Sequence, residues 1–310
     1  MRQPVLIDTD AGVDDSLALI VALRSPELDI KAITTVAGNV RVGQCTRNVF
    51  AILDQLHVDP RFMVAEGASK PLVRRLVTAP EVHGADGFGN ARPRKRSGRK
   101  ISSIPAPRVI AEMSREWGKK LTIVALGPLT NIALALRRYP RVLKNIGRLI
   151  TMGGAFRVPG NTGPVAEFNY YVDPEAADIV LSSGIAVTVV PLDLTQQIVV
   201  MHRELERRAL RRANRLSKLI VRMTRFYMKY HARTENFFGG FLHDPITMAA
   251  AIQPSLFQTQ RLHVEIETKG ILTRGMSVAD FRNQPGKGVD VALKFDREQF
   301  LKLFHERLWS

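Results

Sequence analysis

The chain of 310 residues is poor in cysteine, since Cys45 is its single one. One cysteine excludes an intrachain disulfide and argues strongly against a cysteine-ligated zinc site. A chain of this length buries a full hydrophobic core, so it needs neither to fold. It also has no run of about 18 apolar residues, the length that spans a membrane. Its N-terminus, MRQPVLIDTD, lacks the apolar stretch of a signal peptide. We therefore expect a cytoplasmic protein with no membrane partner.

Acidic residues are scarce relative to basic ones. The chain has 29 Asp and Glu against 45 Lys and Arg, a net charge of +16. Such a balance is typical of proteins that bind nucleic acid or another anionic surface. The excess lies almost entirely in two segments, 92–100 and 203–233. The first carries six basic residues and no acid, and we expect it to be a solvated loop.

The stretch 202–238 has no glycine and no proline, which predicts a long helix or a pair of helices. Its basic residues recur at helical spacing and form one stripe, roughly opposite the apolar residues. We interpret this stripe as a solvated helix face, and nucleic-acid binding by the segment 203–233 stays open as an alternative. Tyr227, Tyr230 and His231 could stack on a base, but both tyrosines fall on the apolar side, which favours core packing.

Short apolar runs alternate with longer helical patterns along the chain. The expected strands are 5–7, 30–36, 121–125, 148–152 and 187–191, and the expected helices are 16–24, 42–56, 104–117, 129–139 and 174–183. This alternation predicts an α/β fold with a mainly parallel, Rossmann-like sheet flanked by helices. From residue 264 onward, alternating apolar and polar residues predict a small antiparallel addition at a sheet edge, followed by a helix over 297–308. We expect one domain over 1–310.

Four aspartates, Asp8, Asp10, Asp14 and Asp15, lie within eight residues of the segment VLIDTDAGVDDSLALI. An apolar strand delivers the first two to a turn through Gly12. The other two begin a helix, whose N-terminal dipole tolerates carboxylates. Clustered carboxylates repel one another, and a cation relieves that repulsion. Ligands that are all oxygens suit Ca²⁺ or Mg²⁺ rather than Zn²⁺, so the segment predicts a site for such a cation.

Two enzyme classes place a DxD motif at a strand end of this kind. A haloacid dehalogenase-type phosphatase would use Asp8 as nucleophile and Asp10 as acid and base. Such an enzyme normally has Thr, Ser or Val soon after the turn, where this chain has Asp14 and Asp15. The other class is the nucleoside hydrolases.

The chain resembles the inosine–uridine-preferring nucleoside hydrolases, a family of calcium-dependent ribonucleoside N-ribohydrolases. Six motifs carry the resemblance, in family order across residues 5–245: DTDAGVDD, TVAGNV, VHGADGFG, ALGPLTNIA, MGGAF with GNTGPVAEFNYYVDPEAA, and HDP. A lone DTD would be a weak signal, whereas six ordered motifs are specific. The phosphatase hypothesis offers no role for NTGPVAEFN or HDP.

The resemblance implies the nucleoside hydrolase fold and hydrolysis of ribonucleosides to free base and ribose with one Ca²⁺. The metal ligands would be Asp10, Asp15, Asp244 and the main-chain oxygen of Leu126. The family often has threonine where Leu126 stands, but a carbonyl ligand does not depend on its side chain. Asp10 would take the proton of the attacking water, and His243 would assist the leaving base.

Further residues are expected to bind the nucleoside. They are Asp14, Asn39, His83, Met152, Asn161, Glu167, Phe168 and Asn169. Asp14 and Asn169 would hold the 2′-hydroxyl, and Asn161 and Glu167 the 5′-hydroxyl. The same resemblance implies a homodimer or homotetramer that acts in purine or pyrimidine salvage.

Overall fold

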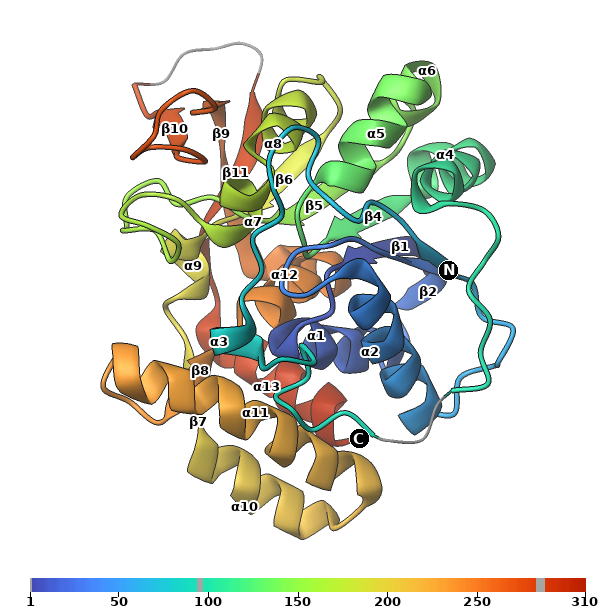
Figure 1. Cartoon of the computed structure of the whole chain (residues 1–310), viewed down its shortest axis with the longest axis vertical. Helices are drawn as coiled ribbons and strands as arrows, with labels where there is room; N and C mark the ends of the chain where they lie inside the picture. Colours follow the sequence, from blue (N-terminus) through green and yellow to red (C-terminus); the bar gives the residue numbers. More distant parts are fainter. Residues whose placement is uncertain (1, 94–96, 283–287) are drawn as a thin grey trace.

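A large sheet runs through the centre of the protein (Figure 1). The computed structural model describes residues 2–93, 97–282 and 288–310. The strands of this sheet are β1 (Gln3–Thr9), β2 (Leu28–Thr35), β3 (Val64–Glu66), β4 (Thr122–Ala125), β5 (Arg148–Met152), β6 (Val187–Val190), β9 (Phe257–Ile266), β10 (Ser277–Asp280) and β11 (Val289–Phe295). They are ordered β10-β9-β11-β6-β5-β4-β1-β2-β3. Neighbours from β11 to β3 pair in parallel, whereas β9 and β10 form an antiparallel edge. The expected fold class is confirmed.

Helices cover both faces of the sheet. They are α1 (Val13–Leu23), α2 (Val42–Gln55), α3 (Pro80–His83), α4 (Ala106–Trp117), α5 (Thr130–Arg138), α6 (Pro140–Leu143), α7 (Phe168–Val172), α8 (Pro174–Leu181), α9 (Leu192–Thr195), α10 (His202–Arg212), α11 (Arg215–Thr234), α12 (His243–Ile252) and α13 (Arg297–Trp309). Val5 and Ile7 of β1 pack with α1, α2, α12 and α13, whereas Leu6 packs with α4, α5 and α8 on the other face. No helix in the described part of the chain has the length and apolar character needed to cross a membrane.

Two of the elements that the sequence did not predict are β3 and α12. All ten residues of α12 are buried. A helix buried on every side lacks the amphipathic period by which helices are recognised. The strand β3 has only three residues, too few to show an alternation.

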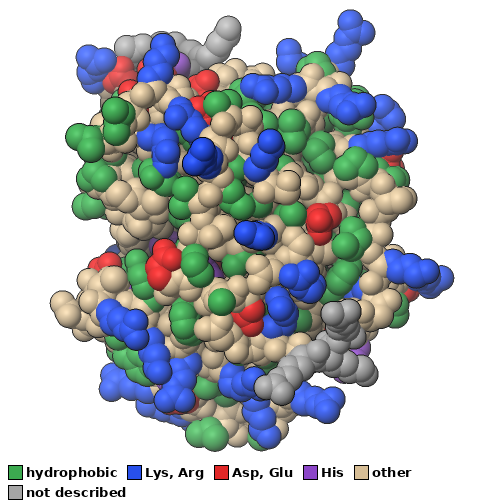
Figure 2. Space-filling view, in the orientation of Figure 1, with side chains coloured by type: hydrophobic (Ala, Val, Ile, Leu, Met, Phe, Trp, Pro, Cys, Tyr) green, Lys and Arg blue, Asp and Glu red, His purple; other side chains and the backbone are tan. Residues whose placement is uncertain are grey.

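The stretch 202–238 forms a pair of helices, α10 and α11. A pair was one of the two outcomes that the sequence predicted. Ala213 ends α10 with a left-handed φ of 48°, and Asn214 caps α11 by accepting a hydrogen bond from the main-chain N–H of Ser217 at 2.8 Å. The basic residues of the predicted stripe are all exposed: Arg203, Arg207, Arg211, Arg215, Lys218, Arg222, Arg225 and Lys229. Lys and Arg side chains gather along the lower edge of Figure 2, over these two helices.

The other basic segment, 92–100, departs from the expected solvated loop at Arg99. Residues 94–96 of that segment lie outside the described residues. The Arg99 side chain is only 4% exposed, because its guanidinium donates to the Asp54 carboxylate at 2.7 Å and to two main-chain carbonyl oxygens. The expectation is therefore wrong for Arg99, which ties its segment to the end of α2.

A buried aspartate joins three segments on the far face of the sheet. Asp173 caps α8 by accepting from the main-chain N–H of Ala176 at 3.1 Å. Its carboxylate also accepts from the main-chain N–H of Leu72 at 2.9 Å and from the Thr130 hydroxyl at 2.6 Å. Asp173 thus fixes α8, α5 and the loop 67–79, which leads to α3.

We expect Asp173→Ala to lower the free energy of unfolding by about 2–4 kcal/mol, because the variant loses a helix cap and leaves two further buried donors unpaired. Chemical denaturation measures this loss. Asp296→Ala is the matched control, since Asp296 caps α13 through the main-chain N–H of Gln299 at 3.0 Å but is exposed. The loss of stability in Asp296→Ala should be smaller than in Asp173→Ala. Equal losses in the two variants would contradict the role of Asp173 in joining three segments.

Candidate functional site

The residues singled out in the sequence follow four neighbouring strands. Asp10 comes just after β1, Asn39 after β2 and Leu126 after β4, while Met152 ends β5. These strands are adjacent in the order β5-β4-β1-β2. The carboxyl ends of parallel strands meet at one edge of a sheet, where ligands bind in folds of this class. A cavity of about 430 Å³ lies at this edge.

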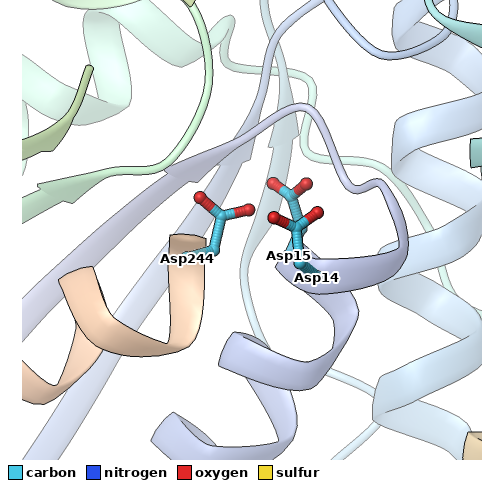
Figure 3. Close-up of side chains that lie close together, drawn as sticks. All are labelled: Asp14, Asp15 and Asp244. Atoms are coloured by element: carbon cyan, nitrogen blue, oxygen red, sulfur yellow. The ribbon is translucent and has the colours of Figure 1, made fainter. Parts of the chain in front are cut away.

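Three carboxylates point toward one another beside the cavity: those of Asp14, Asp15 and Asp244 (Figure 3). One oxygen from each lies within 4.8 Å of the others, and all three residues are buried. Asp14 and Asp15 stand in the first turn of α1, and Asp244 in the first turn of α12. Burial and repulsion by Asp15 raise the pKa of Asp14 to about 8 and hold the pKa of Asp244 well above its usual range. The group therefore concentrates negative charge that a cation would stabilise.

Hydrogen bonds fix two carboxylates at the end of β1. Asp15 accepts from the Thr9 hydroxyl at 2.5 Å, from the main-chain N–H of Gly12 at 2.8 Å and from the Asn39 amide at 3.0 Å. Asp10 accepts from the main-chain N–H of Asn39 at 2.7 Å. The other oxygen of Asp10, Oδ1, is buried and has no hydrogen-bond partner within the described residues. Since an unpaired buried oxygen is costly, Asp10 is poised to interact with a ligand, a water or a cation.

The donors here fit a divalent cation that prefers oxygen ligands. The carboxylate group offers three oxygens within one small volume, and Asp10 has an unsatisfied oxygen nearby. Leu126 lines the cavity, and its main-chain oxygen accepts from the Asn169 amide at 2.7 Å. Carboxylate and carbonyl oxygens are the ligands of Ca²⁺ and Mg²⁺. Asp14, which the family resemblance assigns to the sugar, lies inside this group of three, whereas Asp10 does not.

Eleven of the residues predicted for the site line the cavity. They are Asp14, Asn39, His83, Leu126, Met152, Asn161, Glu167, Phe168, Asn169, His243 and Asp244. The other two, Asp10 and Asp15, are 1% and 0% exposed and are not among the lining residues. The tertiary structure thus collects residues from every predicted motif in one place.

Glu167 holds the segment that closes one side of the cavity. It caps α7, with Oε1 accepting from the main-chain N–H of Asn169 at 2.8 Å and Oε2 from that of Tyr170 at 3.1 Å. Burial raises the pKa of Glu167 to about 7. Asn161 accepts from the main-chain N–H of Phe168 at 2.9 Å. These bonds give the polar side chains of this segment defined positions at the cavity wall.

Three histidines line the cavity, among them His83 of α3 and His243 of α12. Nδ1 of His83 accepts from the main-chain N–H of Val13 at 3.1 Å, and burial lowers the pKa of His83 to about 4. Nδ1 of His243 shares a hydrogen bond of 2.7 Å with the Thr195 hydroxyl. Burial, with the nearby rings of His231 and His83, lowers the pKa of His243 to about 3. Both imidazoles are thus neutral at neutral pH. The sequence carried no signal for Thr195.

The helix α11 supplies part of the wall through Tyr227, Tyr230 and His231. Core packing was expected for the tyrosines. Tyr227 is 4% exposed and does belong to the core, but it also lines the cavity and lies against the His83 ring, with centroids 5.6 Å apart. The spacing i, i+3, i+4 places the three residues on one helix face. This spacing is the feature of the sequence that could have indicated a shared role for the three residues.

The remaining lining residues were not predicted. They are Val77, Thr78, Ala79, Glu81, Val82, Gly160, Thr162, Gln196, Glu235 and Phe241. Most lie in loops or short helices without periodicity, and three of them, Val82, Gly160 and Thr162, lie within the named motifs but were not singled out.

Asp8, the nucleophile of the phosphatase hypothesis, is held by polar contacts inside the sheet. Asp8 is fully buried, and its Oδ1 accepts from the Thr34 hydroxyl at 2.5 Å and from the Asn131 amide at 2.8 Å. Burial raises the pKa of Asp8 to about 7. Asp8, like Asp10, is not among the residues that line the cavity, and its Oδ2 is buried without a hydrogen-bond partner among the described residues.

Comparison with known proteins agrees with this geometry. The model of the family described as inosine-uridine preferring nucleoside hydrolase matches residues 5–302. The pyrimidine-specific ribonucleoside hydrolase RihA of Salmonella enteritidis is 42% identical over 313 residues, covering 99% of each chain. The purine-preferring ribonucleoside hydrolase from Gardnerella vaginalis has a similar structure, with a TM-score of 0.93 at 34% identity over 99% of this chain and 98% of that one. A plant nucleoside hydrolase, the PpNRh1 enzyme, has a TM-score of 0.92 at 37% identity over 100% of both chains.

The backbone at Gly38 lies against the Asp10 carboxylate, so that an added Cβ would overlap its Oδ2 and Cγ atoms. We expect Gly38→Ala to displace Asp10 and to lower the free energy of unfolding by about 1–3 kcal/mol, the usual effect of overpacking. Chemical denaturation measures this change. Gly98→Ala is the control, because its added Cβ meets nothing within 4 Å. If the two variants were equally stable, the close approach at Gly38 would be of no consequence.

Proposed function

This chain belongs to the inosine-uridine preferring nucleoside hydrolase family and is a ribonucleoside hydrolase, and we propose that it works with one calcium ion and with Asp10 as general base. The observation that carries this proposal is the buried group of Asp14, Asp15 and Asp244 beside a cavity lined with amides and histidines. The products would be the free base and ribose.

Hydrolysis of an N-glycosidic bond passes through a sugar with oxocarbenium character. The reaction therefore needs an activated water, an environment that favours a positive sugar, and help for the departing base. Buried carboxylates suit the second need, because their negative potential acts in a site with little water. A phosphate backbone would be repelled by the same field, which argues against nucleic acid as the ligand of this cavity.

Calcium would be held by Asp10, Asp15, Asp244 and the main-chain oxygen of Leu126, with Asp14 beside them. The support is the chemistry of these donors, the proximity of Asp15 to Asp244 and the unpaired oxygen of Asp10. A bound calcium ion would orient a water and lower its pKa.

Asp10 would accept the proton of the attacking water. Its Oδ1 has no partner, while its Oδ2 is held by the main-chain N–H of Asn39 at 2.7 Å, so that the carboxylate has a fixed direction. Burial and the charge of Asp15 hold the pKa of Asp10 well above its usual range. A bound cation would lower this pKa, so that the carboxylate is ionised and able to accept a proton near neutral pH.

The polar lining residues would hold the ribose. Asp14 and Asn169 are assigned to the 2′-hydroxyl, Asn39 with Asp244 to the 3′-side, and Asn161 with Glu167 to the 5′-hydroxyl. All six residues line the cavity. A 2′-deoxy sugar would leave buried polar groups unpaired, which a site of this kind rejects strongly.

His243 would assist the leaving base as a neutral ring. With a pKa lowered to about 3, its imidazole is uncharged in the resting site. If the Thr195 hydroxyl donates to Nδ1 across their 2.7 Å hydrogen bond, the ring proton resides on Nε2. That N–H can then donate to a ring atom of the base as negative charge develops on it.

We expect Asp10→Asn to lower kcat for base release by about 10²–10⁴, the usual contribution of a general base, while the fold is retained. Release of free ribose from purine and pyrimidine ribonucleosides measures the rate, and circular dichroism checks the fold. Asp178→Asn, on the exposed side of α8, removes the same charge and should leave the rate unchanged. A folded Asp10→Asn variant with the wild-type rate would refute the role of Asp10.

Removal of calcium by a chelator should stop ribose release and lower the melting temperature. At a calcium concentration of about 100 times Kd, the ion stabilises the fold by about 2.7 kcal/mol. Asp244→Asn should reduce this calcium-dependent shift, whereas Asp178→Asn should retain it. Scanning fluorimetry with and without calcium gives the shift. An enzyme that keeps both its melting temperature and its activity after exhaustive chelation would contradict the proposed ion.

A further inference from the structure

A second cavity, of about 550 Å³, lies between α10 and α13 and is separate in its lining residues from the catalytic one. These two helices pack against each other. The helix α10 contributes Arg208, Arg211 and Arg212, and α13 contributes Lys302, His305 and Trp309. We call these six residues the α10–α13 groove. The segment of strongest positive charge in the sequence thus forms one of its walls.

Two acidic residues, Glu204 and Glu306, also line this cavity and are outnumbered by its four Lys and Arg residues. Glu204 pairs with Arg208, whose Nε donates at 3.2 Å, and it also accepts from Nε2 of His305 at 2.8 Å. Glu306, the second acid of the lining, is exposed. Among the described residues, no salt bridge joins Arg211 or Arg212 to an acid.

Another arginine, outside the residues that line the groove, is influenced by the charge of Arg212. Arg24, which follows α1, donates to the main-chain oxygen of Leu308 at 2.8 Å. Burial and the positive charge of Arg212 lower the pKa of Arg24. Like charges near each other are an arrangement that an anion stabilises.

Two buried ring nitrogens of the groove have no partner within the described residues. They are Nε1 of Trp309 and Nδ1 of His305, on side chains of residues that are 6% and 8% exposed. The two residues are four positions apart and therefore lie on one face of α13. The indole N–H is only a donor, whereas Nδ1 of His305, whose Nε2 donates to Glu204, is an acceptor in the neutral ring. A buried donor normally has an acceptor, and for the Trp309 indole the acceptor would come from a ligand.

We propose that the α10–α13 groove binds a phosphate group, either as inorganic phosphate or as part of a nucleotide. Phosphate offers several charged oxygens, which match the forked N–H donors of Arg211 and Arg212 as well as the Trp309 indole. The catalytic cavity, with its buried carboxylates, is the opposite environment. The two sites thus select a neutral nucleoside and an anion, respectively.

Isothermal titration calorimetry on the full chain tests this site, with inorganic phosphate as the probe and ionic strength held constant with chloride. A chelator keeps calcium away from the catalytic cavity. We expect saturable binding that the double variant Arg211→Gln/Arg212→Gln weakens at least about tenfold, since hydrogen bonds to charged groups are worth this much. The matched control is Arg222→Gln/Arg225→Gln, which removes two charges from the exposed face of α11 and should keep the wild-type affinity.

Fluorescence locates the bound phosphate. The chain has two tryptophans, Trp117 and Trp309, so Trp117→Phe leaves the groove residue as the single emitter. Its emission should change along the same saturation curve as the heat of binding. Adenosine monophosphate is the second probe. At least about tenfold tighter binding than phosphate, a gain of about 1.4 kcal/mol, would identify a nucleotide site, and equal affinity would identify a site for free phosphate.

Three results would overturn the proposal. One is the absence of saturable binding of either probe at constant ionic strength. Another is an equal loss of affinity in the two double variants, which would assign the effect to net charge alone. The third is binding of an oligonucleotide only, with no change in Trp309 emission, which would place the ligand on the outer face of the helix pair.

Discussion

Mutual repulsion among buried carboxylates is the constraint on which this structure depends. Asp14, Asp15 and Asp244 lie within a few ångströms of one another at the first turns of α1 and α12. Both helix N-termini carry partial positive charge, which offsets part of the repulsion. Three hydrogen bonds to Asp15 offset more. The repulsion that remains contributes to the raised pKa values of Asp14 and Asp244, and a divalent cation would relieve this repulsion.

A second set of hydrogen bonds, deeper in the protein, supports these carboxylates. Asp8 accepts hydrogen bonds from Thr34 and Asn131, and the Asn131 amide also donates to the main-chain oxygen of Thr35 at 3.0 Å. These bonds join β1, β2 and α5 directly beneath the site. The backbone at Gly38 then closes over Asp10 without a side chain between them. Rigid support of this kind fixes the direction of catalytic groups.

Charge of opposite sign is distributed over two separate parts of the surface. The net charge of +16 suggests an anionic partner, yet the catalytic cavity is acidic. The basic residues of 203–233 instead occupy the exposed face of the helix pair and one wall of the α10–α13 groove. The helix α11 carries exposed cations on one side and Tyr227, Tyr230 and His231 on the other, which lines the cavity. One helix therefore meets solvent and the nucleoside site on opposite faces.

The sequence by itself determined the alternation of strands and helices, the aspartates at the end of the first strand and the family, because each is a local pattern of neighbouring residues. Only the tertiary structure decided that Asp244 joins Asp14 and Asp15, that Thr195 contacts His243 and that Tyr227 serves the core and the cavity together. The burial of Arg99 and the unpaired nitrogens of the groove belong to the same class. Such contacts join residues far apart in the chain, and they depend on how helices pack on the sheet, which no periodicity records.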